Sequence, residues 1–211
     1  MTFKFTDDPS KEEEEKKEEE EEHPVMLLAP SRAEPDLRMM GIFSDVTEEK
    51  LPDLVQGLYY LNELNVLEED IEEHKPIEFL ISTYGGSADA MMSLYDIMRL
   101  VMNTTEIHTF GVGKVMSAGV LLLAAGTKGK RKIAKHCRVM MHSVIGASHG
   151  ELHNLVNEME EIQNLQETYI NCLIKETNMT KRQLRKMLER KVNIYLTAKE
   201  AVELGIADII V

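Results

Sequence analysis

The chain has 211 residues, 43% of them hydrophobic, and a formal net charge of −13. This length suits one domain with a sizeable core, and no apolar run approaches the roughly 20 residues of a membrane span. Two cysteines give no disulfide framework and indicate a reducing compartment, which we take to be the cytoplasm. The basic run at residues 128–132 is short, so we expect no nucleic-acid partner and no membrane partner.

The N-terminal part is predicted to differ from the rest of the chain. Its first 23 residues hold eleven acidic residues against four lysines, a net charge of −7. Such a segment cannot bury enough apolar surface to offset its ordering entropy, so residues 1–24 are predicted to be a disordered acidic tail. A solubilising role is favoured over a propeptide or a docking segment. Residues 25–36, with Pro30 and Pro35, are predicted to be an extended linker, and residues 37–211 the folded domain.

The first half of this domain alternates helical and strand patterns. Thr47 is a plausible N-cap for a helix whose leucines follow helical spacing. The apolar run at 76–82 predicts a buried strand, and residues 87–102 predict a Met-rich helix. Residues 107–112 predict a second strand.

The second half continues the alternation. Residues 118–125 predict a small apolar helix and residues 138–141 a third strand. Residues 151–177 lack Gly and Pro and carry one apolar stripe, which predicts a long amphipathic helix that packs on a partner subunit as well as on its own core. Thr180 with Gln183, and Thr197 with Glu200, predict two capping boxes. Strands alternating with helices indicate an α/β fold with a substantial parallel sheet.

Three short segments carry residues suited to acyl transfer. Ser117 follows a predicted strand and opens an apolar helix, beside backbone N–H groups that can stabilise an oxyanion. Gly86 ends the neighbouring strand and can offer a second N–H, and His142 follows the third strand. From the residues alone, a helix cap, a turn and a core histidine explain the same three positions.

The same segments resemble the proteolytic subunit of the ATP-dependent Clp protease, the ClpP family, from about Leu37 to Val211. The similar segments are the strand and glycine turn at 79–86, the helix at 93–98, the serine segment at 113–119, the basic turn at 125–131, the strand ending in His142, and the C-terminal helix with its exit at 195–208. The resemblance is continuous and implies the family's spiral of ββα units, with helix 151–177 as a protruding handle.

The resemblance also implies roles for individual residues. Ser117 would be the nucleophile, His142 the general base and Asn193 the third triad member, with oxyanion N–H groups from Gly86 and Ala118. Backbone near the substrate-binding residues Gly85, Ala88 and Ile145 would pair with an extended unfolded polypeptide. The enzyme would be a serine-type endopeptidase without cofactor or metal, built as seven-membered rings paired face to face and fed by a Clp-type AAA+ unfoldase.

The sequence departs from the family at several of these places. The triad aspartate is replaced by Asn193, which carries no charge to stabilise an imidazolium, so we expect weak peptidase activity. Val192 replaces an arginine linked to contact between rings, Val144 replaces a proline, and Tyr84 replaces the proline before the glycine pair.

Three alternatives remain open at this point. In the first, the chain would be a weak or inactive structural subunit in a mixed ring with an active relative. In the second, it would be an acyl-CoA enzyme of the related crotonase type. In the third, it would be a metal protein using His149 and His153. The Ser-His pair disfavours the crotonase type, which does not need one. The metal site is disfavoured because Glu151 is one place late for the zinc-binding motif H-E-x-x-H.

Overall fold

The computed structural model describes residues 37–146, 149–189 and 192–211. The predicted tail, residues 1–24, and linker, residues 25–36, lie outside the described residues. In the described part the chain folds into a mixed α/β unit. In chain order its elements are β1 (Met39–Ile42), α1 (Leu51–Val66), η1 (Ile71–Glu73), β2 (Ile77–Thr83), α2 (Ala88–Val101), β3 (Ile107–Met116), α3 (Ala118–Ala124), β4 (Lys132–Ile133), β5 (Arg138–Met141), α4 (Leu152–Glu176), α5 (Lys181–Leu188), β6 (Ile194–Leu196), α6 (Ala198–Glu203) and β7 (Ile209–Ile210).

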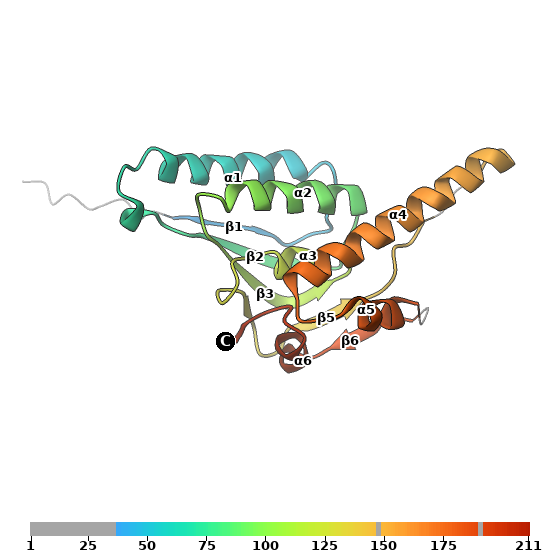
Figure 1. Ribbon diagram of the computed structural model, residues 1–211. Helices are drawn as coiled ribbons and strands as arrows, with labels where there is room; N and C mark the ends of the chain where they lie inside the picture. The colour runs from blue at the N-terminus through green and yellow to red at the C-terminus, as the bar shows by residue number, and fades with distance from the viewer. Residues whose placement is uncertain (1–36, 147–148, 190–191) are drawn as a thin grey trace, which may run out of the picture. The chain divides into compact units, whose positions relative to one another are not determined.

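The sheet is mostly parallel and divides at β3. Strands β1, β2, β3, β4 and β7 lie in that order and pair in parallel. The second half of β3 pairs instead with β5, which also pairs with β6, the one antiparallel partner among the described strands. Helices α1 and α2 lie side by side along the β1–β3 part of the sheet, and α4 projects away from the sheet (Figure 1). The predicted α/β class is confirmed.

The core explains why these segments adopt these structures. In β2 every second residue is buried, because successive side chains of a strand point to opposite faces of the sheet and one face packs into the core. All seven residues of α3 are buried, so this short helix is apolar on every side and lies inside the domain. Both predicted capping boxes are present, at Thr180 with Gln183 and at Thr197 with Glu200.

Two predicted boundaries are wrong by more than one residue. Helix α1 begins at Leu51, not after Thr47, and has Lys50 as its N-cap. A start at Thr47 would place Pro52 inside the helix, where its missing N–H would lose a backbone hydrogen bond, whereas the observed start leaves it in the first turn. The second strand continues to Met116, because Gly113 at φ +65° forms an irregularity in β3 without ending the strand.

Candidate active site

The carboxyl ends of three parallel strands meet at one edge of the sheet. β3 ends at Met116 and is followed by Ser117, β5 ends at Met141 and is followed by His142, and β2 is followed by the Gly85-Gly86 turn. The Ser117 N–H donates to the Met140 carbonyl at 2.8 Å, which ties the two strand ends together. Ligand sites in open α/β sheets form at such edges. The strand register therefore brings Ser117 to the same edge as Gly86, 31 positions earlier, and His142, 25 positions later.

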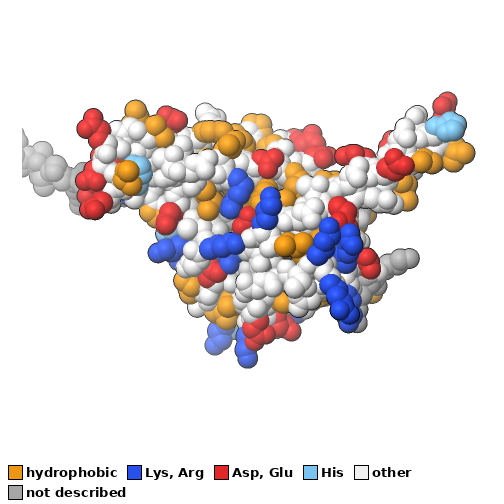
Figure 2. All heavy atoms as spheres, in the orientation of Figure 1, with side chains coloured by type: hydrophobic (Ala, Val, Ile, Leu, Met, Phe, Trp, Pro, Cys, Tyr) orange, Lys and Arg blue, Asp and Glu red, His pale blue; other side chains and the backbone are white. Residues whose placement is uncertain are grey.

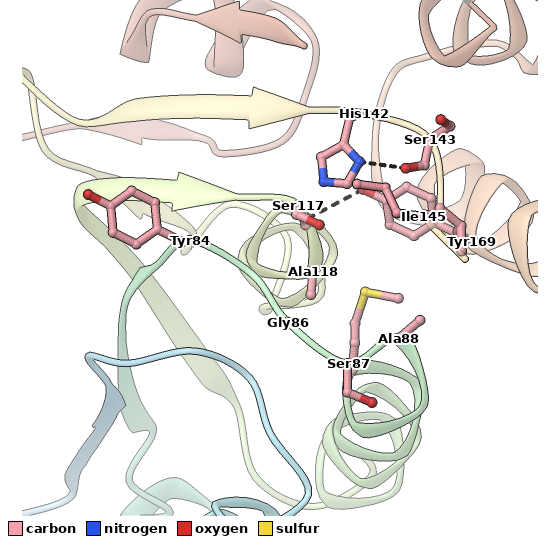
Figure 3. A pocket seen from close by; sticks show the side chains of 12 residues that line it. Tyr84, Gly86, Ser87, Ala88, Ser117, Ala118, His142, Ser143, Ile145 and Tyr169 are labelled. Carbon is pink, nitrogen blue, oxygen red and sulfur yellow. Dashed lines mark hydrogen bonds between the residues drawn. The ribbon is translucent and has the colours of Figure 1, made fainter. Parts of the chain in front are cut away.

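A cavity of about 340 Å³ lies at this edge. The cavity is lined by Tyr84, Gly86, Ser87, Ala88, Met91, Ser117, Ala118, His142, Ser143, Val144, Ile145 and Tyr169. Figure 3 shows the His142 imidazole above the Ser117 side chain, with Ala88 and Ile145 toward one end and Tyr84 toward the other. Six predicted site residues thus line one cavity, while Gly85 and Asn193 do not line it.

The backbone at Ser117 is unusual. Its φ of 53° and ψ of −118° make it the one residue other than glycine with positive φ among the described residues. Such a conformation costs about 1–3 kcal/mol and is found where surrounding structure imposes it. The result is a sharp turn from strand to helix that presents the side chain at the cavity.

The Gly85-Gly86 turn packs directly against this serine. A Cβ on Gly85 would lie 2.5 Å from Ser117 Cβ, and one on Gly86 would lie 2.1 Å from the Val46 carbonyl oxygen. Both glycines have positive φ, so only glycine fits here. Within the described residues no acceptor takes the N–H of Gly86 or Ala118, which leaves both groups available to a ligand oxygen.

The His142 ring is oriented by its own loop. Its Nδ1 lies 2.5 Å from the Ser143 carbonyl oxygen. A carbonyl oxygen can only accept, so Nδ1 is the protonated nitrogen in this contact, and in the neutral form of the ring Nε2 then has the free lone pair. This is the tautomer that a general base needs to take a proton from a hydroxyl. Among the described residues no hydrogen bond joins Ser117 Oγ to His142, and catalytic hydrogen bonds often form only when substrate is bound.

Asn193 lies at the same edge but outside the cavity lining. β5 and β6 are antiparallel, with Met141 opposite Ile194, so one further step of the register places Asn193 opposite His142. Its side chain is exposed and has no hydrogen bond among the described residues. The acceptor that the imidazole N–H reaches is therefore the Ser143 carbonyl.

The sequence did not single out Ser143 or Tyr169 as site residues. Tyr169 lies on helix α4 and is buried, and its hydroxyl donates to the Ser117 carbonyl oxygen at 3.5 Å. Burial raises the pKa of Tyr169 above its ordinary value, so its hydroxyl keeps the proton.

Comparisons with known proteins identify the family of the chain. The family model described as Clp protease matches residues 36–211. One similar protein is ATP-dependent Clp protease proteolytic subunit 4 of Rhodococcus jostii (strain RHA1), 36% identical over 135 residues, which are 64% of this chain and 68% of that protein. Another is ATP-dependent Clp protease proteolytic subunit 1 of Prochlorococcus marinus (strain MIT 9312), 31% identical over 173 residues, which are 82% and 83% of the two chains. The chain belongs to the Clp protease family.

Proposed function

We propose that this chain is the serine-type endopeptidase subunit of a Clp-like protease and that Ser117 is its nucleophile. As a member of the Clp protease family the chain is a peptidase, a hydrolase of peptide bonds. The observation that carries the assignment of residues is the cavity at the strand ends, which brings together Ser117, His142 and the free N–H groups of Gly86 and Ala118. A nucleophile, a base and two oxyanion donors are the parts that acyl transfer needs.

The proposed reaction has two halves. Ser117 Oγ attacks the carbonyl carbon of the scissile peptide while His142 Nε2 takes its proton, and the oxyanion is held by the N–H groups of Gly86 and Ala118. The intermediate then collapses, the C–N bond breaks, and His142 returns the proton to the leaving amine. Water next attacks the acyl-enzyme with His142 as base again, which releases the carboxylic acid and restores Ser117.

The substrate is proposed to be an unfolded polypeptide in extended form. Ala88 and Ile145 both line the cavity, and Ile145 is 80% exposed. Backbone at Ile145, with the Gly85 turn beside it, would add the peptide as a strand, while Ala88, the first residue of helix α2, would form part of the cavity wall. Pairing through the main chain does not depend on the substrate's side chains, which would suit broad specificity.

Asn193 in the third position predicts low activity. A neutral amide cannot stabilise the imidazolium that forms during attack, and in the chymotrypsin-type triad an aspartate-to-asparagine change lowers kcat about 10⁴-fold, a known example from another enzyme. The Ser143 carbonyl keeps the productive tautomer, so the expected activity is low and not zero.

The subunit is proposed to work in an assembly. Enclosed active sites spare folded proteins, so we propose a heptameric ring, stacked in pairs, that receives polypeptide from a Clp-type AAA+ unfoldase in the cytoplasm. The long helix α4 projects from the body with an exposed apolar row, which a partner subunit would cover. None of the described helices is long and apolar enough to cross a bilayer.

Hydrolysis of a small acylated fluorogenic peptide tests the proposal. The purified wild-type chain is expected to release the fluorophore, while Ser117→Ala and His142→Ala are expected to fall to the level of buffer. Ser82→Ala is a matched control, because this serine lies in β2 outside the cavity lining. Equal rates in wild type and Ser117→Ala would overturn the assignment and favour a structural subunit.

A further inference from the structure

The loop that follows β5 carries one side of the cavity and has few ties to the molecule. Residues 142–146 have no regular secondary structure, and four of them line the cavity. Among the described residues, one hydrogen bond ties the backbone of residues 143–146 to another element: the Val144 N–H donates to Gln166 Oε1 at 2.8 Å. The position of the Ser143 carbonyl, and with it the His142 ring, therefore depends on a side chain of helix α4.

One face of α4 reaches both halves of the proposed catalytic pair. Ile162, Gln166 and Tyr169 are spaced at i, i+4 and i+7, so they lie on one face. A Cβ on Gly146 would lie 2.2 Å from Ile162 Cδ1, which shows how closely the loop packs on this face. Gln166 is half-buried and Tyr169 buried. The helix thus contacts the His142 loop and the Ser117 backbone within two turns.

We propose that Gln166 is a positioning residue for His142. By accepting the Val144 N–H it fixes the backbone between Ser143 and Val144, so that the Ser143 carbonyl accepts the Nδ1 proton and Nε2 is left free for the Ser117 proton. The inference rests on the proposed function. Gln166, acting through the main chain, would orient the His142 ring. The uncharged and exposed Asn193 does not perform that task here.

The hydrogen bond between residue 144 and Gln166 requires a backbone N–H at position 144. A proline at this position would have no N–H and could not form the bond. Gln166 acts before any substrate binds, so its loss disorders the base without removing a contact to substrate. The expected effect is a fall of kcat of about tenfold with little change in KM, because an interaction that orients the base contributes to the transition state and not to ground-state binding.

The test measures the rate at which a fluorophosphonate labels Ser117, together with kcat and KM on the fluorogenic peptide. Gln166→Met, which keeps size and removes the acceptor, and Val144→Pro, which removes the donor, are each expected to lower the labelling rate about tenfold. The double variant is expected to lose no more than either single variant, since both remove one interaction. Gln166→Glu keeps an acceptor oxygen and is expected to restore most of the rate.

Gln163→Met is the matched control, the same change at an exposed position of α4 without a hydrogen bond among the described residues. Thermal unfolding of each variant verifies that the fold is kept. Labelling of Gln166→Met at the wild-type rate, or fully additive losses in the double variant, would overturn the positioning role while leaving the proposed function intact. Failure of the wild-type chain to be labelled at all would overturn both.

Discussion

At the scale of single residues, the site depends on close approach between main-chain segments. Gly85 leaves no room for a side chain beside the Cβ of Ser117, and Ser117 itself has a positive φ. The nucleophile is held from three sides: by the glycine turn, by the Met140 carbonyl and by the Tyr169 hydroxyl. Small changes at these contacts are expected to move the hydroxyl group away from its base.

Gly85→Ala tests this packing. The added methyl would lie 2.5 Å from Ser117 Cβ and 3.0 Å from its Oγ, so the serine must shift. A misplacement of this size is expected to lower kcat about 10²-fold. Gly129→Ala is the matched control, because it also has positive φ but its Cβ would meet nothing within 4 Å. Equal activity losses in the two variants would mean that backbone strain, and not contact with Ser117, explains the effect.

Asn193→Asp tests the missing charge. The register places residue 193 opposite His142, where a carboxylate would stabilise the imidazolium formed during attack. We expect kcat on the acylated peptide to rise by about tenfold or more, with KM nearly unchanged. Steady-state kinetics of the two proteins at one pH measures this. An unchanged kcat would show that the carbonyl of Ser143 already meets the requirement.

At the scale of elements, much of the architecture is predictable from the sequence. The capping boxes at Thr180 and Thr197 are local signals, because the cap and its partner are three residues apart, and both form. The long helix also follows its periodicity, within one residue at each end. The pairing of β5 with the second half of β3 is not a local signal, since it depends on where the sheet divides. The sequence could therefore suggest Ser117 and His142 through resemblance, but not the helix contacts of Gln166 and Tyr169.

The C-terminal segment is fixed by an ion pair that predicts a pH effect. Arg131 donates from Nε to Asp208 Oδ2 at 2.8 Å and from its main-chain N–H at 3.1 Å. Burial alone raises the pKa of Asp208, but the hydrogen bonds and charge of Arg131 outweigh it, so this pKa lies below its usual value. A depressed pKa in the folded state contributes stability that is present above the ordinary aspartate pKa, about 3.9, and is lost as the pH falls below it.

Asp208→Asn is expected to lower the free energy of unfolding by about 2 kcal/mol at pH 7, because Arg131 is left buried without its carboxylate partner. Between pH 5 and pH 3 the variant is expected to lose less stability than wild type. Urea unfolding at pH 7, 5 and 3 measures both effects. Parallel pH curves for the two proteins would show that this carboxylate does not contribute to the acid sensitivity.

At the scale of the whole molecule, helix α4 carries more apolar surface than its own domain covers. Leu152, Val156 and Met159 are 72%, 49% and 57% exposed on its first turns. Figure 2 shows hydrophobic atoms along the projecting end of this helix. An exposed apolar row of this kind marks an interaction surface, which fits the proposed assembly of several copies.

Val156→Asp tests this surface. A charge in the middle of the row is expected to shift the protein toward smaller species in sedimentation velocity, because burying it unpaired is costly. Asn157→Asp, the same charge at the neighbouring exposed polar position, is expected to leave the distribution unchanged. Identical sedimentation of wild type and Val156→Asp would place the subunit contacts elsewhere.

His142 is proposed to activate Ser117 as a nucleophile, and covalent labelling of the serine measures that activation. The full-length chain is treated with a fluorophosphonate, and mass spectrometry of its peptides locates the adduct. We expect one adduct, on Ser117, that forms far more slowly in His142→Ala and is absent from Ser117→Ala. An unlabelled Ser117, or labelling at the same rate without His142, would contradict it.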